Sequence, residues 1–147
     1  MTDEEFLEAF EDCTLEEFHH ADHIRMAWIY LRKFGYTAGS IKVKEGIKKF
    51  AAAKNANTLY HETITEFWIR LVLHVIQANT NVENFSEFLH STWALLDAKS
   101  IFSHYTKDFL MSEKAKKEWM PPNLMPMPAL LNSSTETNSW LPPFNVE

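Results

Sequence analysis

The chain has 147 residues, of which 46% are hydrophobic and 23% charged, and it carries a formal net charge of −6. This length fits a single domain that buries most of its apolar surface, and three glycines are few for an all-β protein, which needs them at turns and bulges. The negative charge excludes a general nucleic-acid binder, because phosphate binding requires a basic surface.

Two sequence patterns predict where the first helices begin. The pattern Thr-x-x-Glu, in which side chains and backbone N–H groups cap each other, occurs at residues 2–5 and 14–17. The first occurrence predicts a short helix over about residues 3–11. The second predicts a long helix over about residues 15–34, and Gly35 after it is a typical C-terminal cap.

Apolar residues at helical spacing continue along the chain. A third helix is expected over about residues 38–54, with apolar side chains on one side and lysines on the other. A fourth is expected over about residues 58–79, opened by Thr58. The weaker signals beyond it predict shorter helical segments, over about residues 85–96, 100–110 and 112–119.

The C-terminal part of the chain has a different composition. Pro121 and Pro122 end the helical pattern, and the residues after them are rich in Pro, Asn, Ser and Thr without any period. We therefore expect an all-α, single-domain helical bundle over residues 1–120, followed by an irregular, Pro-rich C-terminal tail over residues 121–147.

The segment EEFHHADHIRMAW, residues 16–28, places three histidines within five positions of an expected core helix. At about 100° per residue, His20 falls at the centre of the apolar side of helix 15–34. His23 lies about 60° from it, whereas His19 lies nearer the polar boundary. Two of the three imidazoles are therefore predicted to point into the core.

The same projection of helix 58–79 separates a polar face from an apolar one. The polar face, which we expect to be in water, contains Glu62, Glu66, Arg70 and Gln77. The apolar face contains Ile64, Trp68, Val72 and Val75. His61 lies in the middle of the apolar face. We therefore expect His61 to face His20 and His23 across two adjacent helices.

Three buried imidazoles cost free energy unless each is paired. One arrangement that pairs all three is a metal ion bound by His20, His23 and His61, with an open fourth position as in catalytic zinc sites. Ligation by imidazoles alone suits Zn, Fe, Cu or Ni and does not select among them. The alternatives are a cluster of histidines hydrogen-bonded to their neighbours, and an accidental placement that follows from a wrong helix phase.

Two motifs contain these histidines. One is F-x-H-x-x-H-x-R-x-A-W at residues 18–28, and the other is Y-H-x-T-x-T-x-x-W at residues 60–68. Both resemble motifs of a family of small, largely uncharacterised bacterial helical proteins. The resemblance picks out His20, His23 and His61 and implies no established activity. It extends over about residues 15 to 128, and its further positions are Tyr105 and, where the family usually has Asp, Asn123.

Other side chains are expected in the wall or the outer shell of such a site. Trp68 follows His61 along the apolar face and would line the wall. Thr65 lies near His61 on the projection and would supply an outer-shell hydroxyl, although a bond to its own helix is the ordinary expectation. Arg25 either reaches a substrate carboxylate at the end of the bundle or pairs with Asp22 on the surface.

Two classes of function follow from this interpretation. In the first, the protein is a small metal-dependent enzyme whose metal acts as a Lewis acid or redox centre on a small-molecule ligand. In the second, the histidines are structural, and the acidic bundle with its Pro-rich tail is a non-enzymatic protein-interaction module. The sequence does not decide whether the protein is an enzyme.

The expected compartment is the cytoplasm. The acidic, amphipathic N-terminus has no feature of a signal or transit peptide. The most apolar run, IRLVLHVI, is interrupted by Arg70 and His74 and is far shorter than the roughly 20 residues of a membrane span. We therefore expect neither a membrane nor a nucleic acid as a partner.

Overall fold

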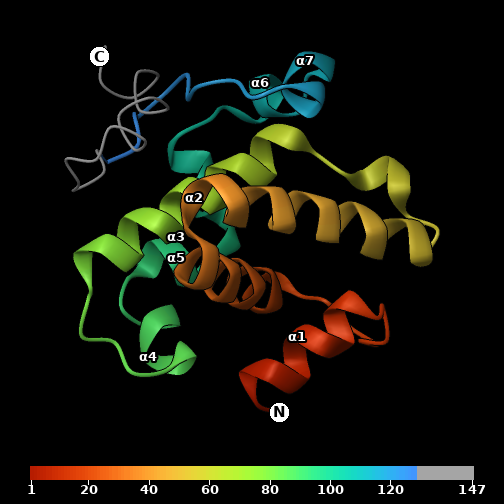
Figure 1. Ribbon diagram of the computed structural model, residues 1–147. Helices are drawn as coiled ribbons and strands as arrows, with labels where there is room; N and C mark the ends of the chain where they lie inside the picture. The colour runs from red at the N-terminus through yellow and green to blue at the C-terminus, as the bar shows by residue number, and fades with distance from the viewer. Residues whose placement is uncertain (129–147) are drawn as a thin grey trace.

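Helices build the described part of the molecule (Figure 1). The computed structural model describes residues 1–128, and within this range it contains α-helices and 3₁₀-helices and no strand. The predicted all-α fold is therefore confirmed for this range. None of the helices within it combines the length and the apolar composition that crossing a bilayer requires.

The first helix, α1 (Asp3–Glu11), begins as predicted. The Glu5 N–H donates to Thr2 Oγ1 at 3.0 Å, and the Thr2 N–H donates to Glu5 Oε1 at 2.8 Å, which completes the capping box. Phe10 of this helix is 1% exposed. Its ring stacks on Phe50, with 5.7 Å between ring centroids, and this contact attaches α1 to the helix that follows.

The second helix, α2 (His20–Ala53), begins later than the predicted residue 15. The hydroxyl of Thr14 does not cap it, because this hydroxyl donates to the carbonyl of Ala9 in α1 at 3.2 Å. Instead, Asp22 Oδ2 accepts a hydrogen bond from the N–H of His19 at 3.0 Å at the start of α2. The capping box predicted at residues 14–17 is therefore wrong, since the hydroxyl belongs to the turn after α1.

Gly35 interrupts α2, as predicted, and a second helical run follows directly. Its φ of 77° and ψ of −176° are non-helical and lie in a region that residues with a side chain rarely adopt. The runs before and after it, residues 20–34 and 36–53, correspond to the helices predicted over 15–34 and 38–54.

The central helix, α3 (Glu62–Ala78), packs along α2. The start predicted at residue 58 is wrong, because the first residues form a separate 3₁₀ turn, η1 (Asn57–Leu59). Tyr60 and His61 between them have extended backbone conformations. His61 therefore precedes α3 and does not lie on its apolar face.

Short helices follow α3 in the second half of the chain, and among them α4 packs against α2 and α7 against α3. They are α4 (Phe85–Leu89), α5 (Trp93–Leu96), η2 (Ala98–Ser103), α6 (Lys107–Leu110) and α7 (Glu113–Lys117). The single helix predicted over residues 85–96 is wrong, because Thr92 has an extended backbone and its hydroxyl accepts from the Ala94 N–H at 3.4 Å. Figure 1 shows α1 at one end of the bundle, and α6 and α7 at the other.

Residues 119–128 contain no helix and no strand, but they are attached to the bundle. The Leu124 N–H donates to the carbonyl of His104 at 2.9 Å, and the His104 ring donates from Nδ1 to the carbonyl of Met125 at 2.7 Å. The predicted domain boundary at residue 120 stays a prediction. Most of the predicted tail, residues 129–147, lies outside the described residues.

Candidate functional site

A pocket of about 450 Å³ lies between α2, η1, α3 and the segment from η2 to α6. Pockets that hold small organic molecules typically have volumes of about 300–1,000 Å³. The residues that line it are His20, His23, Met26, Ala27, Val43, Ile47, Leu59, Tyr60, His61, Ile64, Thr65, Trp68, Ile69, Ala98, Ile101, Phe102 and Leu110.

The pocket lining that residues 1–128 form contains no acidic and no basic side chain apart from its histidines. Most of the side chains in it are aliphatic or aromatic. Met26 and Leu110 are fully buried. Leu59 and Phe102, in contrast, are 76% and 41% exposed. The pocket is therefore an apolar cavity with an apolar mouth.

His61 caps the N-terminus of α3 and uses both of its ring nitrogens. Nδ1 accepts a hydrogen bond from the Ile64 N–H at 3.1 Å. Nε2 lies 2.7 Å from the carbonyl oxygen of Leu110, and since a carbonyl only accepts, the ring hydrogen is on Nε2. A neutral imidazole has one N–H and one lone pair. His61 therefore has no lone pair left for a metal or a ligand.

His20 and His23 lie one turn apart at the start of α2, and each makes one bond to the backbone. His20 Nε2 donates to the carbonyl of Leu95 at 2.7 Å, and His23 Nδ1 donates to the carbonyl of His19 at 3.0 Å. The His20 ring also meets Trp68 edge-on, with 4.7 Å between centroids. Burial lowers the pKa of His23 despite the opposing effect of the bond to His19, and so the neutral ring is favoured.

The predicted metal site is wrong. Within residues 1–128, no group of three or more His, Cys, Asp and Glu side chains is arranged to hold a metal ion. His20, His23 and His61 line the same pocket, but each ring is oriented by a different backbone carbonyl. The helical projection that turned His61 toward the other two does not apply, since His61 precedes α3. Within residues 1–128 they are therefore not arranged as a metal site, and the choice of Zn, Fe, Cu or Ni as a cofactor stays a prediction.

The other predicted site residues divide between the pocket and the α1 side of the bundle. Thr65 and Trp68 line the pocket. The Thr65 hydroxyl donates to the carbonyl of His61 at 2.8 Å, one turn earlier. Arg25 lies outside the lining and pairs with Asp3 of α1 at 2.8 Å. The expected pairing of Arg25 with Asp22 is therefore wrong.

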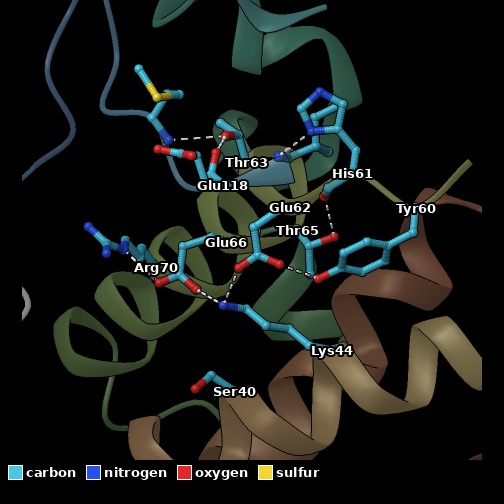
Figure 2. Close-up of polar contacts among 12 residues, drawn as sticks. Ser40, Lys44, Tyr60, His61, Glu62, Thr63, Thr65, Glu66, Arg70 and Glu118 are labelled. Carbon is cyan, nitrogen blue, oxygen red and sulfur yellow. Dashed lines mark hydrogen bonds and ion pairs between the residues drawn. The ribbon is translucent and has the colours of Figure 1, made fainter. Parts of the chain in front are cut away.

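A second set of polar side chains, predicted to face water, lies between α2 and α3 and is buried or half-buried; Figure 2 shows its contacts. Lys44 Nζ lies 2.7 Å from both Glu62 Oε2 and Glu66 Oε1. Arg70 Nε donates to Glu66 Oε2 at 2.7 Å. The side chains of Glu66 and Arg70 are only 2% and 7% exposed, so their prediction as part of a solvated face is wrong. We call Lys44, Glu62, Glu66 and Arg70 the ionic network.

Two tyrosines donate to the carboxylates of this network. Tyr36 donates to Glu66 Oε2 at 2.6 Å, and Tyr60 donates to Glu62 Oε1 at 2.7 Å. Burial and the neighbouring carboxylates raise the pKa of both phenols, which keeps them protonated donors. Burial would also raise the pKa of Glu62, but hydrogen bonds from Lys44 and Tyr60 hold it below its ordinary value. Tyr60 lines the pocket as well, and so it joins the pocket to the network.

The sequence contains one local signal for the ionic network. Glu62, Glu66 and Arg70 follow each other at intervals of four residues, and such residues form one stripe along a helix. The same spacing is typical of a solvated helix face. The partner that distinguishes the two cases is Lys44, which comes from α2.

Comparisons with known proteins identify no relative of this chain. No protein family, no curated protein and no solved structure matches it. The resemblance to a small bacterial family through residues 18–28 and 60–68 therefore stays a prediction. The function has to be inferred from the geometry of the site.

Proposed function

We propose that the protein binds a small, mostly apolar organic molecule in the pocket between α2 and α3. The observation that carries the proposal is a cavity of about 450 Å³ with an uncharged, largely apolar lining. An apolar ligand gains roughly 25 cal/mol for each Å² that it removes from water. An ionic ligand would lose its hydration and find no opposite charge in the lining.

The hydrogen bonds around the pocket support a preformed site. His20 reaches Leu95 at the end of α5, and His61 reaches Leu110 at the end of α6. These bonds join residues 75 and 49 positions apart in the sequence, and so they hold the short helices of the wall against α2 and α3. A wall that is ordered before binding reduces the entropy lost when a ligand binds.

The test is a fluorescence titration with Nile red, a neutral dye whose emission changes in apolar surroundings. We expect saturable binding of one dye per chain. Ala98→Trp places a large side chain at an exposed position of the lining and should weaken binding by at least about tenfold, a loss of about 1.4 kcal/mol. The matched control is Ala53→Trp, at an exposed alanine of α2 outside the lining, which should keep the wild-type affinity.

Two results would contradict the proposal. One is the absence of saturable binding to the wild-type protein. The other is equal weakening by Ala98→Trp and Ala53→Trp, because the dye would then bind to the surface and not in the pocket. Thermal melts of both variants establish that they are folded before the titrations are compared.

A further inference from the structure

Some polar groups of the pocket have hydrogen-bond partners within the protein, and others do not. The Tyr60 hydroxyl donates to Glu62, and the Thr65 hydroxyl donates to the carbonyl of His61. Both nitrogens of His61 are bonded to backbone groups. These three side chains therefore have no hydrogen left for a ligand.

In His20 and His23, only one of the two ring nitrogens makes a hydrogen bond to the protein. Each uses its N–H on a backbone carbonyl, which leaves the lone pair of His20 Nδ1 and of His23 Nε2. Neither nitrogen has a hydrogen-bond partner within the part of the chain that the structure describes. The two residues are three positions apart on α2, and so they lie on the same side of the helix.

One side-chain donor of the lining is also without a partner among residues 1–128. This donor is the indole N–H of Trp68, whose ring meets the His20 ring edge-on. The residues that line the pocket therefore carry two ring lone pairs and one N–H that the described part of the protein leaves unpaired. A ligand group that both donates and accepts a hydrogen bond matches this set, and a hydroxyl is the simplest such group.

We infer that the ligand carries a hydroxyl group, an alcohol or a phenol, that donates to His20 Nδ1 or His23 Nε2. This inference rests on the proposed function, since it assigns the chemical class of the molecule in the pocket. A pure hydrocarbon leaves both lone pairs unpaired, at the cost of lost hydration. Among the described lining residues, a carboxylate would meet lone pairs and no Lys or Arg, and an ammonium group would meet no Asp or Glu.

The test uses four probes of one shape: naphthol, naphthalene, naphthoate and naphthylmethylammonium. Isothermal titration at neutral pH gives the affinity of each. We expect naphthol to bind about three- to tenfold more tightly than naphthalene, which is the contribution of one net hydrogen bond. Both charged probes should bind more weakly than naphthol.

Variants then assign the preference to the two imidazoles. Replacing both His20 and His23 by Leu should abolish the preference for naphthol, measured as the ratio of the naphthol and naphthalene affinities within the variant. Because the variant also loses the bond from His20 to Leu95, both affinities are expected to fall, and only their ratio tests the inference. The matched control is His90→Leu. The His90 ring makes the same bond to the carbonyl four residues earlier as His23 does, at 2.9 Å, but it is exposed and outside the lining. This variant should keep the preference.

The outcomes separate this inference from the proposed function. If naphthol and naphthalene bind equally, and Ala98→Trp weakens both, the pocket binds apolar molecules but the inferred hydroxyl is wrong. Tightest binding of naphthoate or of the ammonium probe overturns the inference in the same way, as does a preference that survives in the double Leu variant. If none of the probes binds, or Ala98→Trp has no effect, the proposed function fails and the inference fails with it.

Discussion

The pocket and the ionic network are neighbours at the α2–α3 interface, but they satisfy their polar groups differently. In the network, charged side chains pair with each other, and Tyr36 and Tyr60 add hydrogen bonds to the carboxylates. In the pocket, His20 and His23 each pair with a backbone carbonyl through one ring nitrogen and keep a lone pair on the other. A polar set whose charges pair with each other within the protein stabilises the fold, whereas one that keeps unpaired lone pairs is suited to a ligand.

Among the variants considered, Glu66→Ala is expected to lower the free energy of unfolding most. The substitution leaves Arg70 and Lys44 at the interface without the carboxylate that both contact. Removing one partner of a buried ion pair typically lowers the free energy of unfolding by about 3–5 kcal/mol. Urea denaturation followed by circular dichroism measures this change, and the folded fraction should still bind Nile red.

The control for Glu66→Ala is Glu113→Ala. Glu113 belongs to an exposed pair with Lys117, at 4.0 Å, in which the side chains are 81% and 76% exposed. Exposed pairs contribute little, and so this variant should unfold at nearly the wild-type urea concentration. If Glu66→Ala and Glu113→Ala lowered the free energy of unfolding equally, the ionic network would contribute no more to stability than an exposed ion pair.

An intermediate effect is expected from His61→Ala. The variant loses the cap of α3 and the bond to Leu110, which together should lower the free energy of unfolding by about 1–2 kcal/mol. His61→Asn keeps a side-chain oxygen that accepts from the Ile64 N–H, and Asn is a preferred N-cap residue. The free energy of unfolding should therefore fall less in His61→Asn than in His61→Ala. If Asn and Ala are equally destabilising in thermal and urea unfolding, capping is not the role of His61.

The smallest effect concerns the pH dependence of stability. Burial lowers the pKa of His23 in the folded state below its ordinary value of 6.5. Below about pH 6.5 the unfolded chain binds a proton that the folded chain does not, and so stability falls as the pH falls from there toward the lower, folded-state pKa. In His23→Gln this part of the decline should be absent. Urea midpoints of both proteins between about pH 7 and pH 5 test this, and parallel curves would contradict it.

The start of α1 and the interruption at Gly35 could both be predicted because their causes are local. The Thr2–Glu5 capping box joins residues three positions apart. Gly35 has a φ of 77° that few other residues adopt. The capping box predicted at Thr14 does not form, because the Thr14 hydroxyl donates to the carbonyl of Ala9 in α1.

The histidines show where a local pattern stops being sufficient. The helical projection turned His20 and His23 inward, and both do line the pocket. It misplaced His61, because the projection assumes one continuous helix and the chain is extended at this residue. Where a helix begins depends on what its first polar groups meet, and here the His61 ring bridges Ile64 and Leu110.

By itself, the sequence determined the helical class, the positions of most helical segments and the broad division into polar and apolar residues, because these follow from spacing along the chain. Only the tertiary structure decided which polar residues are buried. Glu66 belongs to the core because Lys44, from another helix, compensates its charge, and His20 is oriented by a carbonyl 75 residues away. The free energy of burying a polar group depends on its partner, and a partner from a distant segment leaves no trace in the local pattern.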